Sequence, residues 1–521
     1  MALDDVSLVH GVVLRAVPAL AVMASAVSIA RRPTRWWWKT LPRLVASAAV
    51  AVTVLAWYLR HSGLIMDHYP ATFRLWIGGA LLALLVAVAG WRSACRWQKA
   101  VAVAVVPLCC ASAFLLINAH YSYWPTLGDL LGRPLRNQIS SQALTRVLAG
   151  RADASEPPPL GSPAALGAVG RRGAAPAAGG GIAQATAKRV VTVTDGALAS
   201  DPALAAGPTA AAYGAGLSSN AAARATGVSH RASAGSGTLH PQTAASTGPV
   251  GAAPLQGVLA PLSIPGATSG FASRQGMVYL PPAFFDSPPP ALPVLVMLGG
   301  TPGGPQDWTR GGLAAQTADT YAALHHGVAP ILAFVDHNGS FARDTECVDG
   351  PAGHAETFLA VDVPRYLSNV LHVPLDPSRW GIAGFSEGGT CAFDLTVGHP
   401  DAYGTFIDMA GDRAPNLGSA TETLRRLYGG DRAEMAAHDP ANLLRRHGQS
   451  HLDGWFIAGR SDSQHVAIAD QLTAAARAAG MDVGETILPG GHNWQFAATA
   501  FRALLGPVAQ HFASPAGDEG R

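Results

Sequence analysis

Residues 380–389 read Trp-Gly-Ile-Ala-Gly-Phe-Ser-Glu-Gly-Gly, and this decapeptide constrains the fold more than any other part of the chain. An apolar run ends at Gly384, Ser386 follows, and a stretch compatible with a helix begins at Glu387. In so tight a turn, a side chain two residues before or after the serine would collide with the backbone, so glycine is required there. Ser386 itself is expected at positive φ. The pattern therefore predicts a buried strand that turns sharply into a helix.

The chemistry that this turn favours is nucleophilic attack by Ser386. Gly-x-Ser-x-Gly occurs once in the chain, directly after an apolar run and before a helical stretch, which is the context of a nucleophile elbow. The alternative interpretation is a serine in an ordinary glycine-rich turn. Because a serine hydroxyl is a weak nucleophile at neutral pH, the hypothesis requires a base and a carboxylate that orients the base.

Candidates for both partners follow in the chain order Ser, acid, His. Asp462 comes just after an apolar strand-like run, and His492 lies in a Gly-Gly turn just after the next one. The residues between Asp462 and His492 suffice for one helix and one strand, as a parallel sheet requires. The sequence thus predicts a catalytic triad of Ser386, Asp462 and His492.

Two other residues near these positions, Asp412 and His465, could also belong to the site. Asp412, which follows the preceding strand-like run, is the alternative acid, or else a loop carboxylate that caps the next segment. His465 lies close to Asp462 but at the start of an expected helix, so we interpret it as a surface residue. We favour Asp462 as the triad acid and keep Asp412 as the alternative.

A tetrahedral intermediate also needs donors for its oxyanion. The backbone N–H of Glu387, the residue after the nucleophile, is the expected first donor. The second is expected from the loop 299–304, at Thr301 or Gly300, because Pro302 has no N–H. The alternative is a plain flexible glycine turn. The loop lacks the spacing of a phosphate-binding loop.

From about residue 254 the sequence alternates between strand-like and helical segments. The expected strands are 276–280, 293–298, 330–335, 379–383, 404–409, 453–458 and 483–488, with helices at 312–325, 355–370, 387–398 and 464–479. Short, almost wholly apolar strands that alternate with helices are typical of a mostly parallel sheet covered on both faces. We therefore predict one α/β domain over 251–515, with 412–452 as a cap over its pocket.

The N-terminal part has a different character. Only 13% of the 521 residues are charged and 49% are hydrophobic, as expected when membrane segments accompany a soluble domain. Residues 1–120 contain four apolar segments of nearly membrane-spanning length, at about 11–30, 44–59, 73–91 and 100–117. Arginine and lysine are concentrated in the first and third loops, so the positive-inside rule places the C-terminal domain outside the cytoplasm. We expect a multi-pass protein of the cell membrane whose helices contact the lipid bilayer.

Between these two parts the composition changes twice. We expect 121–150 to form an ordered juxtamembrane segment, as a short amphipathic helix near the membrane. Residues 151–250 are rich in Ala, Gly, Pro and Ser and are predicted to be a disordered linker, with one strand-like run at Val190–Val193.

Cysteine usage and charge limit the remaining function classes. Cys347 and Cys391 are expected either to form one disulfide in an oxidising compartment or to remain two buried thiols. The cysteines and histidines show no zinc spacing, and the chain has no cofactor motif, so we predict neither a metal nor a cofactor. A net charge of +2 argues against a nucleic-acid partner.

With these residues in place, about residues 254–512 resemble the esterases of the alpha/beta-hydrolase superfamily. That group includes esterase-D-like enzymes, feruloyl esterases and the cell-envelope mycolyltransferases. The matching pieces are Leu298-Gly299-Gly300 with Trp308, the serine motif, His399-Pro400-Asp401 with Tyr403, the Gly459–Asp462 turn and Gly-Gly-His492-Asn-Trp494. The resemblance implies the triad Ser386–Asp462–His492. Its oxyanion loop reads Gly-Gly-Thr where many esterases have His-Gly.

Together these features predict a membrane-anchored, extracytoplasmic serine esterase that acts on acyl esters. One alternative is an acyltransferase of the mycolyltransferase kind, which moves an acyl group to a cell-envelope sugar by the same residues. Another is a catalytically silent hydrolase fold that serves as a binding module. The four apolar segments carry almost no internal charge, so we interpret them as an anchor rather than a transport pathway.

Overall fold

The computed structural model describes residues 5–29, 32–61, 71–91, 96–155, 256–341, 343–446 and 452–513. By its internal contacts the chain divides into one unit of Met1–Pro157 with Pro249–Arg521 and a second of Pro158–Gly248, and every described residue belongs to the first. Apart from a helix that ends at Ser155, the predicted linker lies outside the described residues, as does the strand predicted at Val190–Val193.

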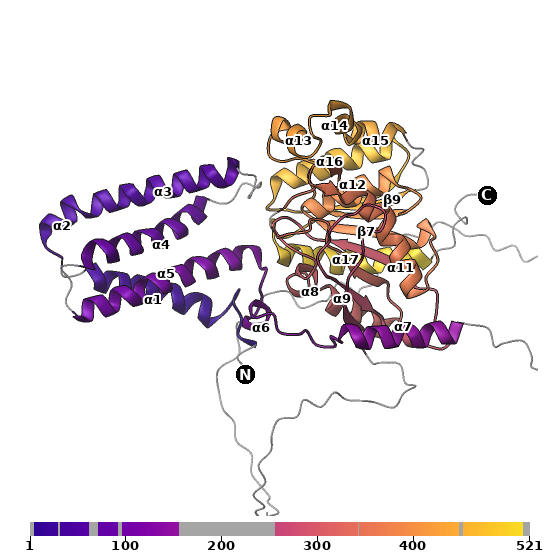
Figure 1. The fold of residues 1–521 in the computed structure, drawn as a ribbon, viewed down its shortest axis with the longest axis horizontal. Helices are drawn as coiled ribbons and strands as arrows, with labels where there is room; N and C mark the ends of the chain where they lie inside the picture. The colour runs from indigo at the N-terminus through magenta and orange to yellow at the C-terminus, as the bar shows by residue number, and fades with distance from the viewer. Residues whose placement is uncertain are drawn as a thin grey trace, which may run out of the picture. The chain divides into compact units, whose positions relative to one another are not determined.

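Apolar helices make up the N-terminal part, as predicted. They are α1 (Val12–Ile29), α2 (Thr34–Lys39), α3 (Leu41–His61), α4 (Ala71–Gly90) and α5 (Arg96–Tyr121). Four stretches are long and apolar enough to cross a membrane, with α2 and most of α3 counted together as Thr34–Leu59. Large apolar side chains such as Trp57 and Leu75 remain exposed on them, which favours a lipid environment over water. Figure 1 shows these helices as a bundle, in which α5 packs against α1 and α4.

The segment after α5 is ordered but packs differently from the expectation. It contains α6 (Leu127–Leu130), which begins with a capping box between Thr126 and Asp129, and α7 (Ser141–Ser155). The helix expected here near the membrane is α7, yet its Leu144 is buried in the core of the C-terminal domain. The backbone N–H of Ile139 also donates to the carbonyl of Leu259. This segment is therefore packed on the α/β domain.

An eight-stranded sheet organises the C-terminal domain. Its strands are β1 (Val258–Leu262), β2 (Gly276–Leu280), β3 (Val294–Leu298), β4 (Ile331–Phe334), β7 (Trp380–Phe385), β8 (Thr405–Met409), β9 (Asp453–Gly459) and β10 (Asp482–Leu488). The order is β1-β2-β4-β3-β7-β8-β9-β10, antiparallel from β1 to β4 and parallel from β4 to β10. All seven predicted strands are present. The prediction missed β1 and the small hairpin of β5 (Asp349–Gly350) and β6 (Gly353–His354).

Helices cover both faces of this sheet, and the central strands β3, β7 and β8 are therefore buried at every position. The helices are α8 (Asp307–Arg310), α9 (Ala314–Leu324), α10 (Ala355–Thr357), α11 (Val363–Leu371), α12 (Glu387–Gly398), α13 (Ala420–Arg426), α14 (Arg432–Ala437), α15 (Pro440–Arg446), α16 (Ser463–Ala478) and α17 (Trp494–Ala513). One hydrophobic core lies beneath α11, α12 and α16, and the other beneath α9 and α17 (Figure 1). This is the alpha/beta-hydrolase architecture that the sequence predicts.

A disulfide joins Cys347 to Cys391 across this domain. Cys391 lies in α12, directly behind the serine turn, and Cys347 lies in the loop that precedes β5. Of the two arrangements that the sequence left open, the structure therefore has the covalent bond. It ties the loop to the helix that begins at the serine.

Candidate active site

The serine turn has the geometry that its glycines predict. Ser386 follows the last residue of β7 with φ 60° and ψ −126°, and α12 begins at the next residue. A Cβ at Gly384 would lie 1.8 Å from the carbonyl oxygen of Gly388, and one at Gly388 would lie 2.5 Å from the carbonyl oxygen of Leu298. Because neither space exists, both positions require glycine. The strained turn holds the serine side chain at the carboxyl edge of the sheet.

Three side chains from three different loops meet at this edge. His492, in the loop after β10, has its Nε2 2.9 Å from Ser386 Oγ. Its Nδ1 lies 2.9 Å from Oδ2 of Asp462, in the loop after β9. The histidine side chain is 19% exposed and the carboxylate 11%, so both are largely shielded while a ligand can still reach the histidine. The arrangement suits proton transfer from the serine to an imidazole that a carboxylate orients.

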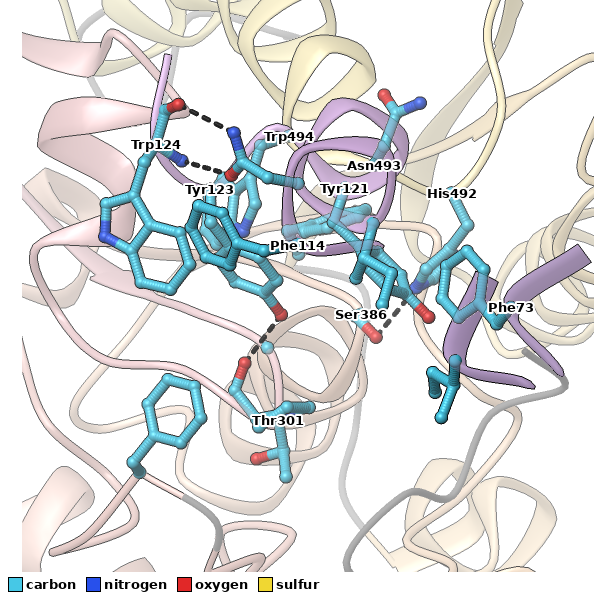
Figure 2. A pocket seen from close by; sticks show the side chains of 17 residues that line it. Phe73, Phe114, Tyr121, Tyr123, Trp124, Thr301, Ser386, His492, Asn493 and Trp494 are labelled. Atoms are coloured by element: carbon cyan, nitrogen blue, oxygen red, sulfur yellow. Dashed lines mark hydrogen bonds between the residues drawn. The ribbon is translucent and has the colours of Figure 1, made fainter. Parts of the chain in front are cut away.

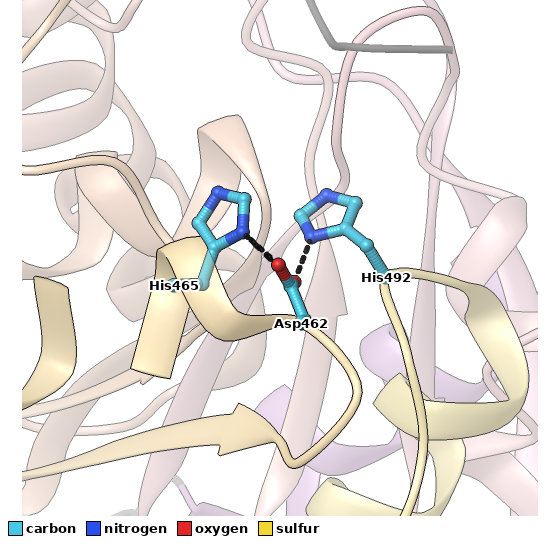
Figure 3. Close-up of side chains that lie close together, drawn as sticks. All are labelled: Asp462, His465 and His492. Carbon is cyan, nitrogen blue, oxygen red and sulfur yellow. Dashed lines mark hydrogen bonds and ion pairs between the residues drawn. The ribbon is translucent and has the colours of Figure 1, made fainter. Parts of the chain in front are cut away.

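The structure places Asp462, rather than Asp412, against His492. Asp412 instead has its Oδ1 3.6 Å from Nε2 of His465, while Nδ1 of His465 lies 2.8 Å from Asp462. The prediction that His465 is a surface residue is wrong, because it is only 7% exposed. Its ring stacks on that of His492 with centroids 4.5 Å apart. Figure 3 shows Asp462 between the two histidines.

Attraction between a protonated His465 and the two carboxylates explains why these side chains lie together. Burial disfavours a charged His465, but its hydrogen bonds with Asp412 and Asp462 outweigh burial and raise its pKa to about 10. Burial raises the pKa of Asp462, but hydrogen bonds from His465 and His492 outweigh burial and hold that pKa well below its usual range. Asp462 is therefore an anion at neutral pH, held in place by a cation on one side and by His492 on the other.

The expected oxyanion residues lie next to the serine. A Cβ at Gly300 would lie 3.0 Å from Ser386 Cβ and 3.5 Å from its Oγ, so the loop after β3 passes close to the serine as bare backbone. The hydroxyl of Thr301 donates to the carboxylate of Glu387. The loop and the residue after the serine are thus tied to each other by a hydrogen bond between their side chains.

A buried polar cluster, which the sequence analysis missed, supports this contact. Asn338 donates to Oε2 of Glu387 at 2.8 Å and to the hydroxyl of Thr301 at 2.7 Å, and His337 lies 3.3 Å from the same carboxylate. Burial opposes charge on the pair, but their attraction lowers the pKa of Glu387 and raises that of His337. His337 lies in the loop after β4 and is buried, and no pattern in the sequence indicates that burial.

A cavity of about 280 Å³ opens beside the serine. Figure 2 shows its lining, which includes Ser386, His492 and Trp494 from the α/β domain together with Phe73 and Tyr121 from the N-terminal part. None of the described residues from 412 to 446 lines it, so this described part of the expected cap over 412–452 does not form its wall. Residues between Phe73 and Trp124, in α4, α5 and the segment after α5, form the wall opposite the α/β domain.

Two groups of side chains among the described residues come close enough to share a metal ion, although the sequence showed no metal-binding spacing. The first group is Asp462, His465 and His492. The second group is Glu356, Glu434 and His438. In the first group the two histidines already bond to the carboxylate. The raised pKa of His465 also keeps that ring protonated, and a protonated imidazole does not bind a metal. Hydrogen bonding therefore accounts for this group.

Comparison with known proteins finds a family and a relative that this chain resembles. Residues 272–508 match the family model whose description is "Putative esterase". An uncharacterized protein of Corynebacterium glutamicum is 40% identical over 235 residues, which are 44% of this chain and 55% of the relative. The chain thus spans about half the length of that curated relative.

Solved structures are similar to about half of this chain. A ferulic acid esterase shares 18% identity with a TM-score of 0.42, and covers 49% of this chain and 98% of its own. An S-formylglutathione hydrolase from Agrobacterium tumefaciens shares 17% identity with a TM-score of 0.40, and covers 50% of this chain and 97% of its own.

Proposed function

Because residues 272–508 form an alpha/beta-hydrolase domain of the esterase family, we propose that the protein is a membrane-anchored serine esterase that acts outside the cytoplasmic membrane. The observation that carries this proposal is the continuous hydrogen-bonded path from Ser386 Oγ through His492 to Asp462. Its substrate would be a carboxylic ester, because an acyl carbonyl is the group that such a serine attacks.

Each residue of the site has a role in the proposed reaction. His492 Nε2 takes the proton of Ser386 as the serine oxygen bonds to the acyl carbon, and then gives it to the departing alcohol. Water attacks the resulting acyl-enzyme, with His492 again as base. Asp462 holds the imidazole in the required tautomer and balances its charge.

The oxyanion would form between two backbone segments. The N–H of Glu387 is the proposed first donor, and that of Gly300 or Thr301 the second. The side chains of Glu387 and Thr301 hydrogen-bond to each other and to Asn338, and this network holds the two backbone segments in place. Because charge develops on the oxygen only as the reaction proceeds, a fixed pair of donors stabilises the transition state more than the substrate.

Anchoring and location are supported by separate observations. Four helical stretches reach membrane-spanning length, and the basic residues of the sequence favour a cytoplasmic first loop. With a cytoplasmic first loop and an even number of crossings, the proposed topology has both the N-terminus and the α/β domain on the outer side. The disulfide between Cys347 and Cys391 is of the kind found in oxidising compartments.

The test uses the full chain in lipid nanodiscs with p-nitrophenyl butyrate and a fluorophosphonate probe. Wild type is expected to hydrolyse the ester and to be labelled, whereas Ser386→Ala loses both, with turnover reduced by about 10⁴-fold or more. Ser461→Ala is the matched control, because Ser461 is an exposed serine near the site. It should keep both signals.

Two other outcomes separate the alternatives. A folded wild type with neither turnover nor labelling would contradict the enzyme and leave a binding module. Release of p-nitrophenol that depends on an added sugar or polyol, with the acyl group recovered on that acceptor, would instead show transfer. Both reactions use the same three residues, so the choice of acceptor alone distinguishes them.

A further inference from the structure

The cavity beside Ser386 is built from two parts of the chain that lie far apart in sequence. One side is the α/β domain, with Ser386 and His492. The other includes Phe73 and Ile77 of α4, and Phe114 and Ile117 of α5. Phe73 and Ile77 lie within the first two turns of α4, and Phe114 and Ile117 within the last two turns of α5. The cavity thus connects the serine to the ends of two helices that have membrane-spanning length.

Specific contacts hold this second side against the α/β domain. The hydroxyl of Tyr123 donates to the carbonyl of Pro302 at 2.6 Å, in the loop beside the serine. Arg310 and Asp129 form an ion pair at 2.9 Å, in which each side chain is 13% exposed. The wall is therefore fixed by one polar contact at the cavity, between Tyr123 and Pro302, and by one outside it, between Arg310 and Asp129.

The cavity wall away from the triad suits a hydrocarbon chain. No Asp, Glu, Lys or Arg is among the described residues that line it. Among the described lining residues on the helical side, Asn118 carries the amide, and both ends of that amide are engaged by the backbone of Trp124, at 2.9 and 3.0 Å. An apolar ligand would therefore leave no polar group of Asn118 without a partner.

We propose that this cavity is the acyl-chain site and that the acyl chain enters it from the outer leaflet of the bilayer. The substrate class is then an ester lipid of the membrane, bound with its carbonyl at Ser386 and its chain against α4 and α5. This inference rests on the proposed esterase function. It adds that the membrane helices form part of the substrate site as well as anchoring the domain.

The test measures kcat/KM for p-nitrophenyl esters of two to sixteen carbons, with the full chain in nanodiscs. Each buried methylene should raise kcat/KM about fourfold until the cavity is full. Ile117→Trp places a larger side chain in the cavity wall on α5, so kcat/KM for long esters should fall at least about tenfold more than kcat/KM for the acetate. Ile117→Ala enlarges the same place and should move the optimum to longer chains.

Val103→Trp is the matched control, because Val103 lies on the same helix, is 61% exposed and does not line the cavity. It should leave the chain-length profile unchanged. The second arm uses an ester phospholipid within the nanodisc, whose hydrolysis should fall in Ile117→Trp but not in Val103→Trp.

The outcomes separate this inference from the function on which it rests. A Ser386-dependent esterase with a flat chain-length profile, identical in all three variants, would overturn the acyl site and leave the esterase. Chain-length selectivity without hydrolysis of the nanodisc lipid would overturn the membrane source and show a soluble ester as substrate. Absence of any Ser386-dependent turnover would instead contradict the esterase itself.

Discussion

At the scale of single residues, the least expected feature is the histidine behind the triad. His465 donates to the same carboxylate as His492 and also faces Asp412, so one cation lies between two anions. Removing its charge would take away the cation that contacts both the half-buried Asp412 and Asp462. We therefore interpret His465 as a positioning residue that fixes Asp462.

A pH-dependent stability difference should reveal this histidine. Its pKa is raised from 6.5 to about 10 in the folded protein, so its stabilising contribution is complete below about pH 6.5 and is lost as the pH rises toward 10. His465→Gln should lower the thermal midpoint by several degrees at pH 6, on the order of 2–4 °C for each kcal/mol lost. The difference from wild type should shrink at pH 10. Differential scanning fluorimetry across this range measures it.

His354→Gln provides the control, because that histidine is exposed and lies away from the triad. Its difference from wild type should be small at every pH. A His465→Gln difference that stays constant from pH 6 to 10 would show that the ring contributes by packing and not by charge.

Sequence could predict a site residue where the strand and turn that carry it determine its place, but not where contacts between separate loops determine it. Ser386 and His492 were identifiable because each follows a strand in a glycine turn, and such turns occupy one edge of a parallel sheet. Asp462 and Asp412 could not be separated in this way, since both follow strands. The choice depends on which loop reaches His492. The burial of His465 was missed because it depends on carboxylates from two different loops.

At the scale of elements, the disulfide connects the oxyanion network to the helix behind the serine. The backbone N–H of Thr345 donates to Asn338 at 2.9 Å, and Asn338 in turn donates to Glu387. Cys347 lies two residues after Thr345 and is bonded to Cys391 of α12. The bond therefore clamps the loop that holds Asn338 onto the helix that begins at Glu387.

Loss of this bond should destabilise the domain. The cysteines are 44 residues apart, and closing a loop of that length stabilises a protein by up to about 4 kcal/mol through the entropy of the unfolded chain. A Cys347→Ser, Cys391→Ser double variant should unfold at a lower denaturant concentration than wild type. Reductant should shift wild type toward the double variant and leave the variant itself unchanged. Equal midpoints with and without reductant in wild type would exclude the clamp.

The elements themselves were largely readable from sequence, for a physical reason. A central parallel strand is apolar along its whole length, and β3, β7 and β8 are buried at every position. Strand β1 was missed because it lies at the sheet edge and contains Pro261. The packing of α7 on the domain was also missed, because its mixed apolar and polar face fits a membrane surface as well as it fits a protein surface.

At the scale of the whole molecule, the cavity could not have been predicted. Phe73 and Ser386 are separated by more than half the chain, and no periodicity relates them. The sequence analysis expected 412–452 as the cap, whereas residues of α4 and α5 line the cavity and no described residue from 412 to 446 does. Composition identified those helices as membrane segments, but only their packing against the α/β domain assigns them a place at the serine.

Membrane topology is the prediction on which this arrangement depends. A fusion of alkaline phosphatase to Arg521 should be enzymatically active, and a fusion of green fluorescent protein at the same place should be dark, because the former folds only outside the cytoplasm and the latter only inside. Fusions after Arg43, the last basic residue between the apolar segments predicted at about 11–30 and 44–59, should give the opposite result. A fluorescent fusion at Arg521 would place the disulfide in a reducing compartment and the cavity at the inner leaflet. The lipids offered to Ser386 would then be those of the cytoplasmic side, so topology determines which leaflet supplies the acyl chain.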